Sequence, residues 1–165
     1  MMRPAILGGL IALVGLIVDQ AVKTWLLFGF DLAEKGRVVI TPFFDLVLVW
    51  NRGISYGLFA ADSQGQVWFL VAVKTAITLA LIIWLVRNTD KLTAIALGLL
   101  IGGAIGNTID RVLYGAVVDF ASLHAFGYYW YVFNLADVWV VAGVALLLYD
   151  AFLVGRNQKV SGEAS

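Results

Sequence analysis

Two aspartates lie in surroundings where a carboxylate could do chemistry. Asp119 stands between apolar residues in Val117-Val-Asp-Phe120, and Asp137 follows Asn134 by three residues in Phe133-Asn-Leu-Ala-Asp137. Two carboxylates that meet in an apolar site must share one proton, because like charges at close range cannot both be ionised. An aspartic protease needs such a pair: the ionised acid takes a proton from the attacking water, and the protonated acid hydrogen-bonds the scissile carbonyl oxygen.

Each acid alone also has a structural explanation. Asp137 opens an apolar run, where an acid stabilises the amino-terminal end of a helix. Asn107 and Asn134 are neutral amides that could hold the carboxylates, or a substrate backbone, without changing their charge. The prediction of a catalytic pair therefore depends on Asp119 and Asp137 lying together.

Other charged residues interrupt the apolar runs, at a cost of roughly 2.5–3.5 kcal/mol each at the centre of a membrane helix. Asp19 and Lys23 are four residues apart and share a helix face, so they could support a site or form an ion pair that makes both charges tolerable. Lys74 has no partner near it in sequence. We expect Lys74 to snorkel outward and assign it no function.

A third polar group ends the next apolar run. Asn107 and Asp110 share a helix face and Arg111 follows, so these residues could support a site or form a helix end in which Asp110 pairs with Arg111. Upstream, glycines at every fourth position allow close approach of another helix. These glycines are Gly98, Gly102 and Gly106.

A fourth group, Asn51, Gly53 and Gly57, follows a stretch rich in β-branched and aromatic residues. It favours a tight turn at least as strongly as a substrate contact, and the residues alone leave both interpretations open.

The composition indicates a membrane protein. Of 165 residues, 62% are hydrophobic and 13% are charged, whereas about half the residues of soluble domains are apolar. Eleven basic and eleven acidic residues cancel, so we expect no nucleic-acid partner. With no cysteine and the single His124, the chain lacks a thiol nucleophile and a His/Cys metal site, and we expect neither metal nor cofactor.

Four apolar runs are long enough to cross a bilayer, which takes about 20 helical residues. We predict an all-α membrane protein formed by a single integral membrane domain, residues 1–165, in which the first span is retained rather than cleaved. The polar residues 155–165 should form a disordered cytoplasmic tail. The expected spans are about 5–30, 67–86, 92–109 and 137–154.

A slight excess of Lys and Arg on the side of both termini favours cytoplasmic termini. Residues 31–66 and 110–136 would then lie outside. The first segment, interrupted by Pro42, predicts short strands that form a small extracytoplasmic β-rich platform. The second carries the aromatic run 126–133, expected at headgroup level, where it could cover a site near the outer face.

Taken in order, the polar motifs resemble those of bacterial prolipoprotein signal peptidase, the type II signal peptidase. The resemblance extends through nearly the whole chain in length, four-span layout and motif order, and five ordered motifs are far more specific than any one of them. The motifs are Val18-Asp-Gln-Ala-Val-Lys23, Asn51-Arg-Gly53, Gly106-Asn-Thr-Ile-Asp-Arg111, Val118-Asp-Phe120 and Phe133-Asn-Leu-Ala-Asp137.

The resemblance implies an aspartic endopeptidase of the bacterial inner (cytoplasmic) membrane with Asp119 and Asp137 as its catalytic pair. The implied substrate is a prolipoprotein whose lipobox cysteine carries diacylglyceryl, cut on the amino-terminal side of that cysteine, and the implied inhibitor is the cyclic peptide globomycin. Ser55-Tyr56 stands where the family leads us to expect Ala-Phe, which bears on substrate preference. The positions assigned to substrate binding or support of the site are Asp19, Lys23, Asn51, Gly53, Asn107, Asp110, Arg111 and Asn134.

Two other protein classes compete with this hypothesis. A channel or proton-coupled carrier would use the acids as a relay, which predicts acids at several depths of the membrane. A non-enzymatic scaffold would dimerise through the glycine stripe, but it leaves the polar motifs without a role. Intramembrane aspartic proteases of the GxGD type are excluded, because the sequence contains no such string.

Overall fold

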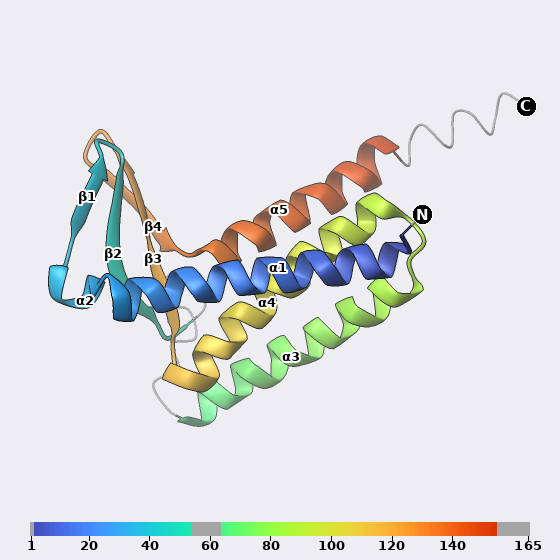
Figure 1. Cartoon of the computed structure of the whole chain (residues 1–165), viewed down its shortest axis with the longest axis horizontal. Helices are drawn as coiled ribbons and strands as arrows, with labels where there is room; N and C mark the ends of the chain where they lie inside the picture. Colours follow the sequence, from blue (N-terminus) through green and yellow to red (C-terminus); the bar gives the residue numbers. More distant parts are fainter. Residues whose placement is uncertain (1, 54–63, 155–165) are drawn as a thin grey trace, which may run out of the picture.

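The computed structural model describes residues 2–53 and 64–154 and consists of four long helices with an antiparallel sheet at one end (Figure 1). The helical elements are α1 (Pro4–Thr24), which continues as the π-helical turn η1 (Trp25–Gly29), α2 (Leu32–Lys35), α3 (Gln64–Arg87), α4 (Lys91–Tyr114) and α5 (Leu135–Tyr149), which continues as η3 (Asp150–Val154). The strands are β1 (Val38–Thr41), β2 (Phe44–Asn51), β3 (Val117–Ala125) and β4 (Tyr128–Phe133).

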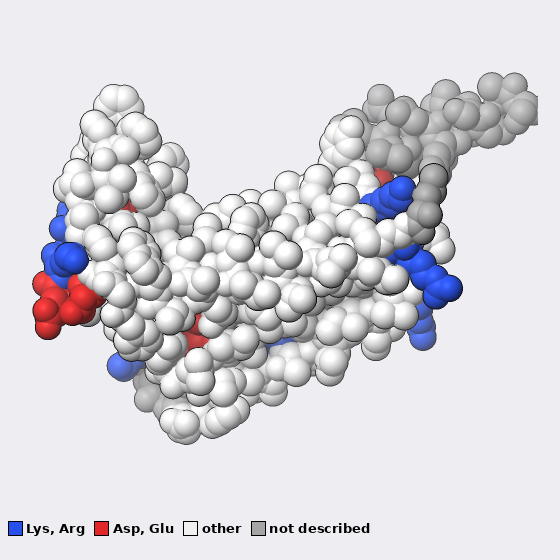
Figure 2. Space-filling view, viewed as in Figure 1, with Lys and Arg blue, Asp and Glu red and all other residues white. Residues whose placement is uncertain are grey.

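Within the described residues, four helices are long and apolar enough to cross a membrane: Pro4–Gly29, Gln64–Arg87, Lys91–Tyr114 and Leu135–Phe152. The most apolar part of α4 is 61% buried in the protein, whereas the corresponding parts of the other three are at most 17% buried. Figure 2 shows charged side chains at the two ends of the molecule and a nearly uncharged surface between them. The chain is therefore a membrane protein in which α4 is the central helix and the others face lipid.

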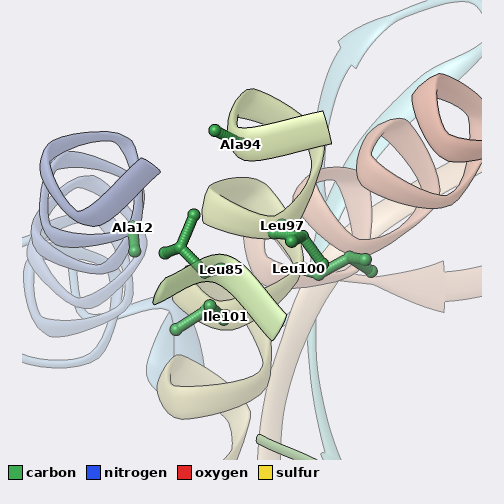
Figure 3. Packing of buried hydrophobic residues seen from close by; sticks show 6 residues of the cluster. All are labelled: Ala12, Leu85, Ala94, Leu97, Leu100 and Ile101. Atoms are coloured by element: carbon green, nitrogen blue, oxygen red, sulfur yellow. The ribbon is translucent and has the colours of Figure 1, made fainter. Parts of the chain in front are cut away.

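The glycine stripe of α4 lies against α1. A Cβ on Gly98 would collide with the backbone carbonyl of Gly8, and a Cβ on Gly102 would lie 2.7 Å from the carbonyl oxygen of Ala12. The stripe is thus used within the chain, which removes the surface on which the scaffold hypothesis relied. A cluster of apolar side chains from α1, α3 and α4 packs between these helices (Figure 3). It comprises Ala12, Leu85, Ala94, Leu97, Leu100 and Ile101.

The four strands pair in chain order, β1-β2-β3-β4, and every neighbouring pair is antiparallel. The β2–β3 pairing joins the two segments predicted to lie outside, and it places Val49 opposite Asp119. Apolar side chains of η1 and α2, among them Leu26 and Leu32, pack against Phe120 and Ala121 of β3. This contact fixes the sheet to the end of the bundle.

The sheet has four strands and is larger than the small platform predicted from the sequence. The predicted all-α class therefore holds for the membrane spans but not for the whole chain. The aromatic run was predicted to lie at headgroup level, with no strand, yet it forms β4 and pairs with β3. The connecting turn has positive φ at Phe126 (51°) and Gly127 (80°). Hairpin turns of this kind are usually signalled by Asn-Gly or Asp-Gly, and Phe-Gly does not give that signal.

The helix bounds differ from the predicted spans mainly at the polar ends. α4 continues past residue 109 to Tyr114, because its polar side chains find partners inside the protein. α5 begins at Leu135, before Asp137, because Asn134 caps it. The expectations for Ser55, Tyr56, Gly57 and the tail 155–165 fall outside the described residues.

Candidate active site

Asp119 and Asp137 come from different elements that the chain brings back to one place. Asp119 lies in β3, and β4 returns the chain to the start of α5, where Asp137 occupies the first turn. Asn134 is the N-cap: its side-chain oxygen accepts from the Asp137 backbone N–H (3.0 Å), and Asp137 Oδ2 accepts from the Asn134 N–H (3.2 Å). The structural interpretation of Asp137 as part of a helix cap is therefore correct, and it leaves Oδ1 for other contacts.

Two asparagine amides connect the carboxylates. Asn134 Nδ2 donates to Asp119 Oδ1 (2.6 Å) and to Asn107 Oδ1 (3.0 Å), while Asn107 Nδ2 donates to Asp137 Oδ1 (2.9 Å). Asp119, Asn134, Asn107 and Asp137 therefore form one continuous hydrogen-bonded chain. Because the amides are neutral, they orient both acids without fixing how many protons the acids carry.

A third amide holds the other oxygen of Asp119. Asn51, at the end of β2, donates from Nδ2 to Asp119 Oδ2 (2.9 Å) and to the Tyr131 hydroxyl (2.5 Å). Its own Oδ1 accepts from the Gly53 N–H (3.1 Å), which is the tight-turn geometry. Asn51 therefore both forms the tight turn and contacts the candidate site, so the two interpretations of this residue are compatible.

Burial dominates the electrostatics of Asp119, which is 1% exposed. The pKa of its carboxyl is raised to about 6, mainly by loss of hydration; hydrogen bonds from Asn51 and Asn134 lower the pKa, whereas the charge of Asp137 adds to the rise. Asp119 consequently retains a proton to higher pH than an ordinary aspartate.

Lys23 is the centre of a second polar cluster beneath the pair. Its ammonium lies 2.9 Å from Asp19 Oδ2, 2.7 Å from Asp110 Oδ2 and 3.1 Å from Asn107 Oδ1. The predicted Asp19–Lys23 ion pair is present, and Asp110 extends it to α4. All three charged side chains are at most 3% exposed.

The acids of this cluster also hold the backbone on either side of the candidate catalytic residues. Asp110 Oδ2 accepts from the Val118 N–H (3.1 Å), and Asp19 Oδ1 accepts from the Ala136 N–H (2.9 Å). Val118 precedes Asp119 and Ala136 precedes Asp137. Asp19 and Asp110 therefore position the two acids through the main chain.

Arg111 does not pair with Asp110, so the alternative in which the two form an ion pair at the helix end is wrong. Neighbouring side chains on a helix point in different directions. Arg111 instead donates from Nη1 to the Asn107 carbonyl (3.2 Å) and from Nη2 to the Gly53 carbonyl (3.1 Å), which ties the end of β2 to α4.

A cavity of about 740 Å³ adjoins Asp137, and its lining includes both polar side chains and apolar residues of α5. Asn51 lines it, whereas Asp119 does not and lies behind the Asn51 amide. Of the lining residues, the polar ones are Asn51, Lys74, Asn107, Arg111, Tyr131 and Asp137, and those from α5 beyond Asp137 are Val138, Val140, Val141, Ala142 and Ala145.

Three residues near the site were given no role in it by the sequence analysis. Lys74 lines the cavity instead of snorkelling outward, so that prediction is wrong. Gln20 donates to Asp19 (3.2 Å) and to Asp110 (3.0 Å). Tyr131 lines the cavity from β4. The position of Lys74 as a charge in an otherwise apolar helix could have indicated a role in the site. Tyr131 gave no such signal, because it is one of several aromatic residues in the run 126–133.

The four acids gather at one end of the bundle, where the helices meet the sheet, and do not follow a path across it. This arrangement does not match the series of depths that a carrier relay predicts. Within residues 2–53 and 64–154, no group of three His, Asp or Glu side chains is placed to hold a metal ion.

Comparison with known proteins gives a consistent result. The family model described as signal peptidase (SPase) II matches residues 11–153. A lipoprotein signal peptidase of Rhodopseudomonas palustris is 57% identical over 157 residues, covering 92% of this chain and 95% of the relative. One from Methylocella silvestris is 46% identical over 163 residues, covering 99% and 95%.

Two solved structures of bacterial membrane enzymes have a fold similar to that of this chain. A bacterial membrane enzyme determined at 2.3 Å resolution superposes with a TM-score of 0.75 at 30% identity, covering 88% of this chain and 89% of the other. A second, determined at 1.9 Å, gives a TM-score of 0.73 at 29% identity, covering 88% and 92%.

Proposed function

The chain belongs to the signal peptidase II family of aspartic peptidases, and on that basis we propose that it removes signal peptides from diacylglyceryl-modified prolipoproteins in the bacterial inner membrane. The peptide bond cut is the one on the amino-terminal side of the lipidated cysteine. The observation that carries this proposal is the pair Asp119 and Asp137, linked through two asparagine amides beside a membrane-embedded cavity.

In the proposed mechanism, Asp119 and Asp137 share one proton and use one water. We assign the resting proton to Asp119, because burial raises the pKa of its carboxyl to about 6. Ionised Asp137, which lines the cavity, takes a proton from the water as its oxygen attacks the scissile carbonyl. Asp119 hydrogen-bonds the carbonyl oxygen. As the C–N bond breaks, the proton that Asp137 took from the water passes to the leaving amine, and the pair again holds one proton.

The asparagines have separate parts in this mechanism. Asn107 and Asn134 keep the carboxylates oriented while their protonation changes, since each amide can donate to either form. Asn51 occupies Asp119 Oδ2, so its amide must give up this bond when the scissile carbonyl approaches. Asn51 would then be free to hydrogen-bond the substrate backbone.

The apolar part of the cavity supports a lipidated substrate. α5 contributes a run of aliphatic side chains to the wall, and α5 itself faces lipid. An acyl-bearing cysteine could thus reach Asp137 without entering water. The same site would receive globomycin as a competitor of the substrate.

We further propose that both termini are cytoplasmic and that the site lies near the outer face. α1 begins and α5 ends at the end of the bundle opposite the sheet (Figure 1). The exported part of a prolipoprotein lies outside the cytoplasm. Because the candidate site is next to the sheet, this substrate favours an orientation in which the sheet is also outside.

The test is cleavage of a diacylglyceryl-modified prolipoprotein by the purified protein in detergent, with an unlipidated substrate as control. Asp119→Asn and Asp137→Asn should each reduce the rate by at least about 10²-fold, the scale of a lost acid or base. Both substitutions keep the side-chain shape, so folding, checked by thermal unfolding, should be retained.

Substantial cleavage by a folded Asp119→Asn or Asp137→Asn variant would remove that residue from the catalytic pair. No cleavage by the folded parent would contradict the proposed function itself. Activity should persist in a chelator, and its loss there would indicate a metal-dependent reaction.

A further inference from the structure

Lys74 of α3 is a charged side chain that the proposed mechanism does not use. It lies within a membrane-spanning helix and lines the cavity beside Asp137. Within the described part of the chain, no acceptor is hydrogen-bonded to its ammonium. The Thr78 hydroxyl donates to the backbone carbonyl of Lys74 and does not contact the ammonium. Such a residue is costly in a membrane helix, and facing a cavity is typical of one that meets a ligand.

Arg111 lines the same cavity from α4 and has unused hydrogen-bonding capacity. The residue is 4% exposed, and although both Nη atoms donate to backbone carbonyls, its buried Nε has no acceptor among the described residues. Lys74 and Arg111 thus line one cavity, and each has a donor group without an acceptor among the described residues. The charges acting on Lys74 are those of Arg111, Asp137, Asp119 and Lys23.

The balance of charge favours an anion in this space. Among the described residues that line the cavity, Asp137 is the one acid, and it shares one proton with Asp119 in the proposed mechanism. Lys23, Asp19 and Asp110 together carry one net negative charge. Their polar atoms are turned to one another, to neighbouring amides and to backbone N–H groups, and none of the three lines the cavity.

The reaction itself produces such an anion. When the peptide C–N bond breaks, the water oxygen stays on the carbonyl carbon, and the signal peptide leaves with a new carboxylate while the lipidated cysteine takes the proton on its amine. This carboxylate forms beside Asp137, which would repel it unless cations are near.

We propose that Lys74, together with Arg111, binds the carboxylate at the new carboxyl terminus of the cleaved signal peptide. The cavity then contains a product subsite specific for an acid end. This inference rests on the proposed function, because the anion is created by that cleavage.

The experiment compares two synthetic signal peptides that end at the residue before the lipidated cysteine, one with a free carboxylate and one with a carboxamide. Their binding to the purified full chain in detergent is measured directly and as inhibition of prolipoprotein cleavage. We expect the acid to bind about tenfold or more tightly, as for an ion pair shielded from bulk water. Lys74→Met should abolish most of this preference, and Lys74→Arg should keep it.

Lys91→Met is the matched control, because it removes the same charge from an exposed residue at the start of α4, outside the cavity. Its preference for the acid should equal that of the parent. Equal binding of the two peptides to the parent, or an unchanged preference in folded Lys74→Met, would overturn the inference. Direct binding needs no turnover, so a failure of the proposed function is recognised separately, as absence of cleavage by the parent.

Discussion

The acids of the site have different kinds of partners. Asp19 and Asp110 contact Lys23, whereas Asp119 and Asp137 accept hydrogen bonds from asparagine amides. A cation beside a carboxylate stabilises its ionised form and makes protonation harder. Amides orient a carboxylate with a smaller electrostatic effect. Asp19 and Asp110 are therefore held in ion pairs that position the backbone, whereas the hydrogen-bond partners of Asp119 leave it suited to holding an exchangeable proton.

The pH dependence of cleavage should follow Asp119. Its pKa is raised to about 6, so the pair keeps its one proton below that pH and loses it above. We therefore expect kcat/KM to fall as the pH rises through about 6. Asn51→Ala removes a hydrogen bond that favours the ionised form, and so should move this decline to higher pH.

The measurement is kcat/KM for a lipidated peptide across the pH range, with Asn88→Ala as the control. Asn88 hydrogen-bonds the Asp90 carbonyl in the turn between α3 and α4, outside the cavity, so its profile should match that of the parent. A decline that stays in place or moves to lower pH in Asn51→Ala would contradict the electrostatic account of Asp119.

Among the elements, α4 determines how closely the helices approach. Its glycines let α1 lie against it on one side, and Gly103 lets α5 approach on another, since a Cβ there would meet the Ala136 carbonyl. Because the helices approach closely, the backbone N–H of Ala136 in α5 can donate a hydrogen bond to the Asp19 carboxylate in α1. The small residues of α4 are therefore a condition for assembling the polar cluster.

Gly98→Ala and Gly9→Ala make the same change at two helical positions with different surroundings. A Cβ on Gly98 collides with the Gly8 backbone, whereas a Cβ on Gly9 meets nothing within 4 Å. We expect Gly98→Ala to destabilise the protein by roughly 1–3 kcal/mol through overpacking. Gly9→Ala should be neutral or slightly stabilising, because alanine favours a helix more than glycine does.

Thermal unfolding of both variants in the same detergent checks this expectation. Equal midpoints for the Gly98 and Gly9 variants would mean that α1 can move away from α4 without loss, contrary to the packing described.

At the scale of the whole molecule, the candidate site lies where the bundle joins the sheet. β2, β3 and β4 bring Asn51, Asp119 and Tyr131, and the helices bring the cluster around Lys23 as well as Asn107, Arg111 and Asp137. Neither part contains the site by itself. If the proposed function is correct, a site at this joint would lie where a lipid-modified residue and water can both be present.

Orientation in the membrane can be tested because the chain has no cysteine of its own. Glu34 is exposed in α2 beside the sheet, and Thr89 is exposed in the turn between α3 and α4 at the opposite end. With an impermeant maleimide on intact spheroplasts, Glu34→Cys should be labelled, and Thr89→Cys should be labelled only after the membrane is permeabilised. The reverse pattern would mean that the sheet is cytoplasmic.

The sequence by itself determined the four spans, because a long apolar run in a membrane has few alternatives to a helix. It also determined which acids to examine, since charge in such runs is rare and the five motifs occur in a recognisable order. The Asp19–Lys23 pair was predictable for the same local reason: four residues apart, they share a face whatever the rest of the chain does.

Only the tertiary structure decided which groups meet. Asp110 bonds Lys23 instead of Arg111, Lys74 faces the cavity instead of the membrane surface, and the aromatic run forms β4. Each of these outcomes depends on partners far away in sequence, and the direction of a side chain is set by how two helices pack or how two strands pair. Spacing along the chain gives the face of one element, but the neighbour of that face is settled only when the elements assemble.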